Sequence, residues 1–225
     1  MTDDPEPVEY QHWEIYVASQ HTKTSEGWAG SPAMIEVNYG VISNVQLHVI
    51  APLAYIAPTH GNTCFGYGDM ELGAKYRFIQ ETPDCPQVGV FPLLEVPTGD
   101  HNRGLGSGHL DAFLPLWLQK SWGQEGREWT AYGGGGYCIN PGMGNRDWIF
   151  VGLVLQRQIT KNVFLGGEIF HRTATQVQDE GDTSFNLATI IDFGEHHHLL
   201  LSAGRSIDGP TKFQTYAAYQ LTFGP

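Results

Sequence analysis

The residues from Gly66 to Phe78 alternate between polar and apolar side chains. The charged residues of this stretch, from Asp69 to Arg77, share one parity, and Met70, Leu72, Ala74, Tyr76 and Phe78 share the other. Because successive side chains of a strand point to opposite faces, the pattern predicts one β-strand with a charged and an apolar face. About ten residues of sustained alternation is the length of a tilted strand that crosses a bilayer, with lipid outside and a polar lumen inside.

Further runs of the same kind occur along the chain, and helical periodicity is not convincing in any of them. The strand-like runs span residues 12–20, 33–41, 45–56, 66–79, 87–97, 109–122, 128–140, 147–159, 163–173, 184–194, 198–206 and 212–223. We therefore expect an all-β protein, a single transmembrane antiparallel β-barrel of about 12 strands.

The connections between these runs alternate in length. Those after the even runs are mostly short, whereas four of those after the odd runs are longer and rich in Gly, Pro and Asp: 21–32, 57–65, 98–108 and 174–183. Outer-membrane barrels have short periplasmic turns and longer extracellular loops. We expect the same here, with both termini on the periplasmic side. Residues 1–11 are acidic and predict an extended N-terminal segment, and residues 12–225 the barrel domain.

Composition narrows the function classes. Hydrophobic residues make up 41% of the 225 residues, yet no run approaches the 18 or so apolar residues of a membrane helix. The net charge of −12 argues against a nucleic-acid partner. The N-terminus has no apolar segment typical of a secretory signal, so an exported protein would have lost its signal by cleavage. The three cysteines, Cys64, Cys85 and Cys138, are too few for a disulfide framework.

Charged side chains are costly on a lipid-facing surface, by about 2–4 kcal/mol for Arg or Lys at the bilayer midplane. Parity therefore assigns a set of polar residues to the lumen, as its lining or substrate path. This set comprises Glu14, Glu36, Asn38, His48, Asp69, Glu71, Lys75, Arg77, Glu95, Asp111, Glu168 and Arg172. Two interpretations remain open: a translocation path of mixed charges, or a structural network of ion pairs that fills the barrel.

Other motifs carry little chemistry. Gly133 to Gly136 lie inside a predicted strand, where glycine permits a bend or the close approach of another segment, such as a bulky lumenal side chain or the N-terminal segment. Consecutive residues of His196-His197-His198 would point in opposite directions, so they predict a solvated turn. No metal, cofactor or nucleophile motif is recognisable, and neither a cofactor nor a catalytic residue is predicted.

Three motifs in the middle of the chain resemble a known family. They are the Gly-Asp strand at 66–77, Glu95-Val-Pro-Thr-Gly99, and the Gly-rich loop from Gly104 to Asp111. Together they resemble the transporter-like outer-membrane proteins associated with the MetA pathway of phenol degradation. The resemblance implies an outer-membrane barrel that admits small aromatic or hydrophobic compounds.

We therefore expect a channel for passive uptake of small molecules, whose partners are outer-membrane lipid and a small-molecule substrate. One alternative is an outer-membrane enzyme that modifies lipid at the external rim, with Ser107 and His109, or His171, as candidates. A second alternative is a soluble β-barrel that binds an apolar ligand; its outward apolar rows argue against it.

Overall fold

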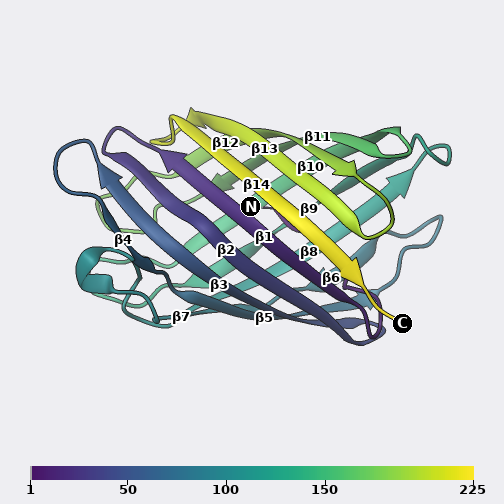
Figure 1. Cartoon of the computed structure of the whole chain (residues 1–225), viewed down its shortest axis with the longest axis horizontal. Helices are drawn as coiled ribbons and strands as arrows, with labels where there is room; N and C mark the ends of the chain where they lie inside the picture. The colour runs from purple at the N-terminus through teal and green to yellow at the C-terminus, as the bar shows by residue number, and fades with distance from the viewer. Residues whose placement is uncertain (1) are drawn as a thin grey trace.

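The chain forms a closed, tilted antiparallel β-barrel in the computed structural model, which describes residues 2–225 (Figure 1). The strands are β1 (Trp13–Lys23), β2 (Gly27–Ile42), β3 (Val45–Pro58), β4 (Cys64–Tyr67), β5 (Met70–Ile79), β6 (Gln87–Val90), β7 (Leu93–Val96), β8 (Asp111–Trp122), β9 (Trp129–Ile139), β10 (Trp148–Thr160), β11 (Val163–Arg172), β12 (Asp182–Asp192), β13 (His197–Asp208) and β14 (Phe213–Phe223). A short 3-10 helix, η1 (His101–Arg103), lies between β7 and β8.

Strands β4 and β5 share one position in the wall, as do β6 and β7, so twelve strand positions close the barrel. Closure occurs where β1 pairs with β14 along its whole length, from Trp13 opposite Phe223 to Lys23 opposite Phe213. A closed barrel leaves no unpaired strand edge in the hydrocarbon region. The predicted all-β barrel of about 12 strands is confirmed.

Two predicted strands are interrupted. The run 66–79 breaks at Gly68 and Asp69, between β4 and β5, and the run 87–97 breaks at Phe91 and Pro92, between β6 and β7. Pro92 lacks a backbone N–H and cannot donate to a strand ladder. The first break coincides with a change in the parity of the apolar residues, which are odd-numbered up to Tyr67 and even-numbered from Met70, and the second lies in an unbroken apolar run from Val90 to Leu94.

The loop predicted at residues 21–32 is wrong, because β1 and β2 extend through most of it and leave only residues 24–26 as a turn. The glycines and proline of this region belong to an irregular strand instead. A β-bulge shifts the register between Gly30 and Met34. Gly30 has φ +150°, and a Cβ atom there would lie 2.1 Å from the carbonyl oxygen of Gln20, so only glycine fits.

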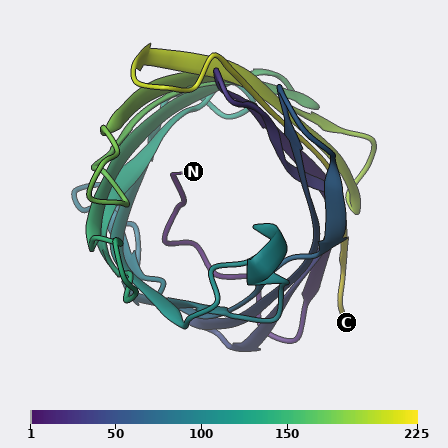
Figure 2. The same cartoon turned by 90° about the vertical axis from the view of Figure 1, so that its left-hand side faces the viewer.

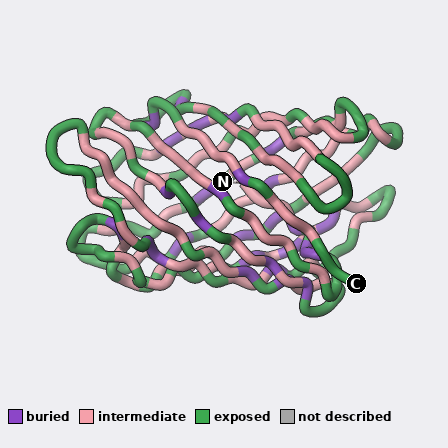
Figure 3. The backbone as a smooth tube through the Cα atoms, in the orientation of Figure 1, coloured by how far each residue is buried: buried purple, intermediate pink, exposed green. Residues whose placement is uncertain are grey.

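The outer wall is apolar and the interior is only partly filled. Exposed Leu, Ile, Val and aromatic side chains project outward from almost every strand, and buried residues are scattered through the wall rather than gathered in one dense core (Figure 3). Within residues 2–225, no helix is long and apolar enough to span a membrane.

The two termini lie in different surroundings. The C-terminus lies at the end of the barrel that carries the short turns, while the N-terminal segment runs inside the lumen (Figures 1 and 2). At the opposite end, the loop that contains η1 folds inward over the mouth of the barrel (Figure 2). Both openings of the lumen are therefore partly covered by the chain itself.

Candidate functional site: the lumen and its N-terminal segment

The N-terminal segment, residues 2–11, passes into the lumen close to Gly40 of β2. The amide of Gln11 donates to the carbonyl of Gly40 at 2.7 Å, and a Cβ atom on Gly40 would lie 1.9 Å from the carbonyl oxygen of Glu9. Any larger residue would collide with the backbone of the segment. Glycine at this position therefore allows the segment to pass close to the barrel wall.

Two inward-facing cations of β5 hold the acidic part of the segment. The Nζ atom of Lys75 lies 3.1 Å from Asp3 and 3.7 Å from Asp4, and its side chain is 7% exposed. Two residues further along β5, Arg77 lies 3.8 Å from Glu6. In a chain with twice as many acids as bases, this places two of the lumenal cations opposite the acidic segment.

Further hydrogen bonds extend the attachment across the lumen. The amide of Val8 donates to Gln46 at 2.9 Å, and Glu6 accepts from Gln87 and Gln119. At its other end, the amide of Thr2 donates to Glu168 on β11 at 2.6 Å. The segment thus spans the lumen from the β3–β8 side of the wall to β11.

A chain of polar side chains continues from the segment into the wall. His48 lies between Asn38, 2.6 Å from Nδ1, and Glu71, 2.9 Å from Nε2, and Glu36 accepts from Asn38. All of these side chains face the lumen. The buried polar groups are paired, as the low polarity of their surroundings requires.

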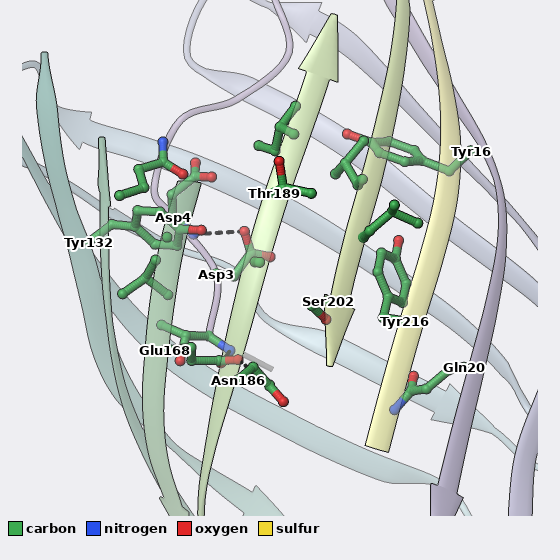
Figure 4. A pocket seen from close by; sticks show the side chains of 18 of the residues that line it. Asp3, Asp4, Tyr16, Gln20, Tyr132, Glu168, Asn186, Thr189, Ser202 and Tyr216 are labelled. Carbon is green, nitrogen blue, oxygen red and sulfur yellow. Dashed lines mark hydrogen bonds between the residues drawn. The ribbon is translucent and has the colours of Figure 1, made fainter. Parts of the chain in front are cut away.

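Beside the segment lies a cavity of about 490 Å³ (Figure 4). Asp3 and Asp4 border it on one side, and side chains of β12, β13 and β14 such as Thr189, Ser202 and Tyr216 border it on the other. Its lining combines acidic and hydroxyl groups with apolar side chains from several strands, among them Ile50, Val154, Phe164, Ile190 and Leu200. A volume of this size accommodates a small organic molecule.

An aromatic cluster lines the wall of the lumen from its middle towards the loop-bearing end. Trp117, Phe91 and Phe150 form the buried centre of this cluster. Phe113 stacks on Trp148 with ring centroids 5.5 Å apart, and Phe150 stacks on Phe170 at 5.7 Å. Trp148 therefore packs against this lumenal cluster, although its place near a strand end is typical of rings at the membrane interface.

The remaining predicted lumenal residues lie near the loop-bearing mouth. Asp69 accepts from the amides of Gly99 and Ser107 and so holds the inward-folded loop in place. Glu95 is paired in register with Glu71 on one side and with Asp111 on the other, which forms an acidic row across the wall. Arg172 lies over the ring of Trp148, 5.9 Å from its centroid.

The predicted lumenal set therefore divides into two groups. One group surrounds the N-terminal segment and the polar chain beside it: Glu14, Glu36, Asn38, His48, Glu71, Lys75, Arg77 and Glu168. The other group, Asp69, Glu95, Asp111 and Arg172, lies nearer the loops. Whether either group contacts a substrate stays a prediction.

The enzyme candidates do not form a catalytic pair. Nδ1 of His109 contacts the backbone carbonyl of Ser107 at 2.9 Å, and the Ser107 hydroxyl donates to the carbonyl of His109. His171 contacts the hydroxyl of Thr183. The Ser–His hydrogen bond that would activate a nucleophile is thus replaced by contacts to backbone atoms.

No group of three or more His, Cys, Asp or Glu side chains in residues 2–225 has the arrangement of a metal site. In the histidine tract, His197 contacts Tyr219, while His198 contacts Asp192. The two side chains diverge, as expected for neighbours on a strand.

The position of Asp4 inside the lumen, next to other acids, affects its ionisation. Desolvation raises the pKa of Asp4 to about 6, although the nearby Lys75 acts in the opposite direction. At neutral pH the segment is therefore ionised at this position, and it becomes neutral in mildly acidic conditions.

Two parts of the site are absent from the sequence-based prediction. Asp3, Asp4 and Glu6 were read only as part of an extended segment, although their charge complements that of Lys75 and Arg77. The aromatic cluster was also missed, although Trp117 has the same parity as the lumenal Asp111. Parity alone could have assigned Trp117 to the lumen.

The fold was compared with known proteins. No protein-family model matches the sequence, and no curated protein matches it. Among solved structures, the barrel is similar to the COG4313 outer membrane channel from Pseudomonas putida F1, with a TM-score of 0.80 and 18% sequence identity over 99% of both chains. The two chains therefore share one barrel fold over nearly their whole length.

Two porins are more distantly similar. The NanC porin has a TM-score of 0.62 and 6% identity, over 92% of this chain and 98% of that one. The KdgM porin, solved in complex with disordered oligogalacturonate, has a TM-score of 0.54 and 8% identity, over 93% of this chain and 99% of that one. At these identities the likeness concerns the fold alone.

Proposed function

We propose that the protein is a channel of the bacterial outer membrane for passive movement of small molecules, and that its N-terminal segment restricts the lumen. The observation that carries this proposal is the cavity of about 490 Å³ that remains between the segment and β12–β14. The apolar outer wall, the closed barrel and the similarity to outer-membrane channels support the membrane location.

The lining favours aromatic or otherwise hydrophobic substrates that carry a polar group. Aromatic rings extend from Trp148 near the loops to Phe91 in the middle of the lumen, next to His48. Rings stack favourably on other rings, whereas hydroxyl and amide groups of the cavity can bind a polar substituent. The resemblance of the three sequence motifs to the phenol-degradation family supports this substrate class.

The experiment compares the wild-type protein with a variant that lacks residues 2–8, both refolded in detergent and inserted into planar lipid bilayers. We expect small current steps from the wild type and steps at least several-fold larger from the variant, because the lumen then loses its filling segment. Glu9→Gln, an exposed change in the same segment, is the matched control and should behave as wild type. Equal conductance of wild type and deletion variant would contradict a restricting segment.

Substrate class is tested separately by uptake into proteoliposomes. Small phenols should enter faster through the wild-type protein than sugars of equal size do, and Phe150→Ala should reduce this preference. Equal rates for both solutes would refute the substrate assignment but leave the channel itself intact. Hydrolysis of lipid by the wild type would instead favour the enzyme alternative.

A further inference from the structure

The outer wall carries a small polar patch beside its apolar band, at the end of the barrel that bears the long loops. It consists of Lys23, Arg205, His21 and Tyr55, which we call the outer basic patch. Lys23 and Arg205 are exposed, and the residues of opposite parity on the same strands, such as Gln20 and Ser202, line the lumenal cavity. The patch therefore faces away from the lumen, towards the membrane.

Strand register brings these residues together although they come from distant parts of the chain. Lys23 is paired with Phe213 of β14 on one side and with Trp28 of β2 on the other. Gly204 is paired with Gln214, so the next residues, Arg205 and Phe213, are neighbours as well. Arg205 and Lys23 thus flank Phe213 across about 10 Å, two strand spacings, which their long side chains can close.

The second pair of the patch lies one step closer to the membrane centre. His21 is paired with Gly30, and Gly30 with Tyr55, so the two rings meet across the glycine with their centroids 5.6 Å apart. Nδ1 of His21 lies 2.9 Å from the hydroxyl of Tyr55. This ring pair adds two hydrogen-bonding groups to the two cations of the patch.

The cations of the patch are not neutralised by the protein. In residues 2–225, no carboxylate lies within salt-bridge distance of Lys23 or Arg205. Lys23 lies over the ring of Trp28, 5.3 Å from its centroid, and Trp28 packs edge-on against Phe213 at 6.4 Å. Aromatic rings of this kind occupy the level of lipid headgroups, so the two cations lie at that level too.

We propose that the outer basic patch binds a phosphate group of the phosphorylated glycolipid in the outer leaflet. A guanidinium and an ammonium group beside rings at headgroup level suit a phosphate oxygen cluster, with Arg205 in bidentate contact and Lys23 as a point charge. The long-loop end faces the outer leaflet. In a chain of net charge −12, two unpaired cations on this face are complementary to an anionic headgroup. The proposal rests on the membrane location, and not on what passes through the lumen.

The test uses the whole chain folded in neutral detergent. Binding of diphosphorylated lipid A, of the same lipid without its phosphates, and of phosphatidylglycerol is measured by native mass spectrometry as apparent Kd values. We expect the diphosphorylated lipid to bind at least tenfold more tightly than either of the others. The double variant Lys23→Gln, Arg205→Gln should lose this difference, and Arg205→Lys should retain part of it.

The matched control is Arg157→Gln. Arg157 also lies over a tryptophan, 5.0 Å from the centroid of Trp129, but at the short-turn end of the barrel. The Arg157→Gln variant should bind the phosphorylated lipid as tightly as the wild type does. Equal affinity for all three lipids, or unchanged affinity in the double variant, overturns the proposal. Because binding is measured without transport, a failure here is distinguishable from a failure of the channel assignment.

Discussion

Replacing Lys75 by Met should release the N-terminal segment from its main electrostatic anchor. Met has a similar length and no charge, so the variant keeps the packing against Phe91 and leaves Asp3 and Asp4 without their cation. Loss of one partner from a buried ion pair costs about 3–5 kcal/mol. Asp3 and Asp4 are about one-third exposed, at 36% and 35%, so water screens part of this cost.

After this discount, docking of the segment should weaken by about 2 kcal/mol, which corresponds to a roughly 30-fold shift of the docking equilibrium. A segment that is docked for about 99% of the time would then be docked for about three-quarters of it. Single-channel recording measures this directly, as the fraction of time spent in a high-conductance level. That fraction should rise from about one-hundredth to about one-quarter.

Lys120→Met is the control for this experiment. Lys120 also forms an ion pair, with Glu81 at 3.2 Å, but its side chain has the parity opposite to that of lumenal Gln119 and contacts the turn at residues 81–82 instead of the segment. Its removal should leave the recordings unchanged. If Lys75→Met folds into a barrel and shows the conductance of the wild type, the segment is not held by this ion pair and the reasoning is refuted.

Three further predictions concern the same fold. The raised pKa means that Asp4 binds its proton more tightly in the docked segment than in the free one, so docking should weaken as pH rises from about 4 to about 6. The fraction of time spent in the high-conductance level should therefore increase over that range, and Asp4→Asn should remove this increase. Gly152→Ala should displace the tip of the segment, since the added Cβ atom would lie 1.9 Å from Oγ1 of Thr2. Current steps larger than those of the wild type would verify the displacement, whereas steps of wild-type size would contradict it. Asp182 accepts hydrogen bonds from three hydroxyl groups at 2.6 Å, so Asp182→Ala should lower the free energy of unfolding by about 2–4 kcal/mol in urea titrations. A loss below about 1 kcal/mol would contradict a stabilising role of these hydrogen bonds.

The alternation of side chains was sufficient to predict the barrel, because parity is a local property that each strand retains in the fold. It placed Glu71, Lys75 and Arg77 on one face of their strand, and the structure places all three in the lumen. It was insufficient at Asp69. There the break between β4 and β5 turns the carboxylate towards the backbone of the loop, and the alternation of a strand does not specify a contact with a loop.

The position of the N-terminal segment depends on contacts between parts of the chain that are far apart in sequence. Thr2 contacts Glu168, and Asp3 contacts Lys75. Neither partner can be chosen from local periodicity, since period-two patterns specify a face but not a neighbour. Charge complementarity was the available signal, and it would have become specific only once Lys75 and Arg77 were known to share a narrow lumen.

The position of the segment also has a consequence for how the protein assembles. Its partners Gln46, Lys75, Gln119 and Glu168 come from β3, β5, β8 and β11, which surround one space only when β1 has joined β14. Long-range contacts of this kind form late, because the ends of long chain loops must first meet. Ordering of residues 2–8 is therefore expected to be the last event of folding, and a spectroscopic probe on Asp3 would report that the cylinder has closed.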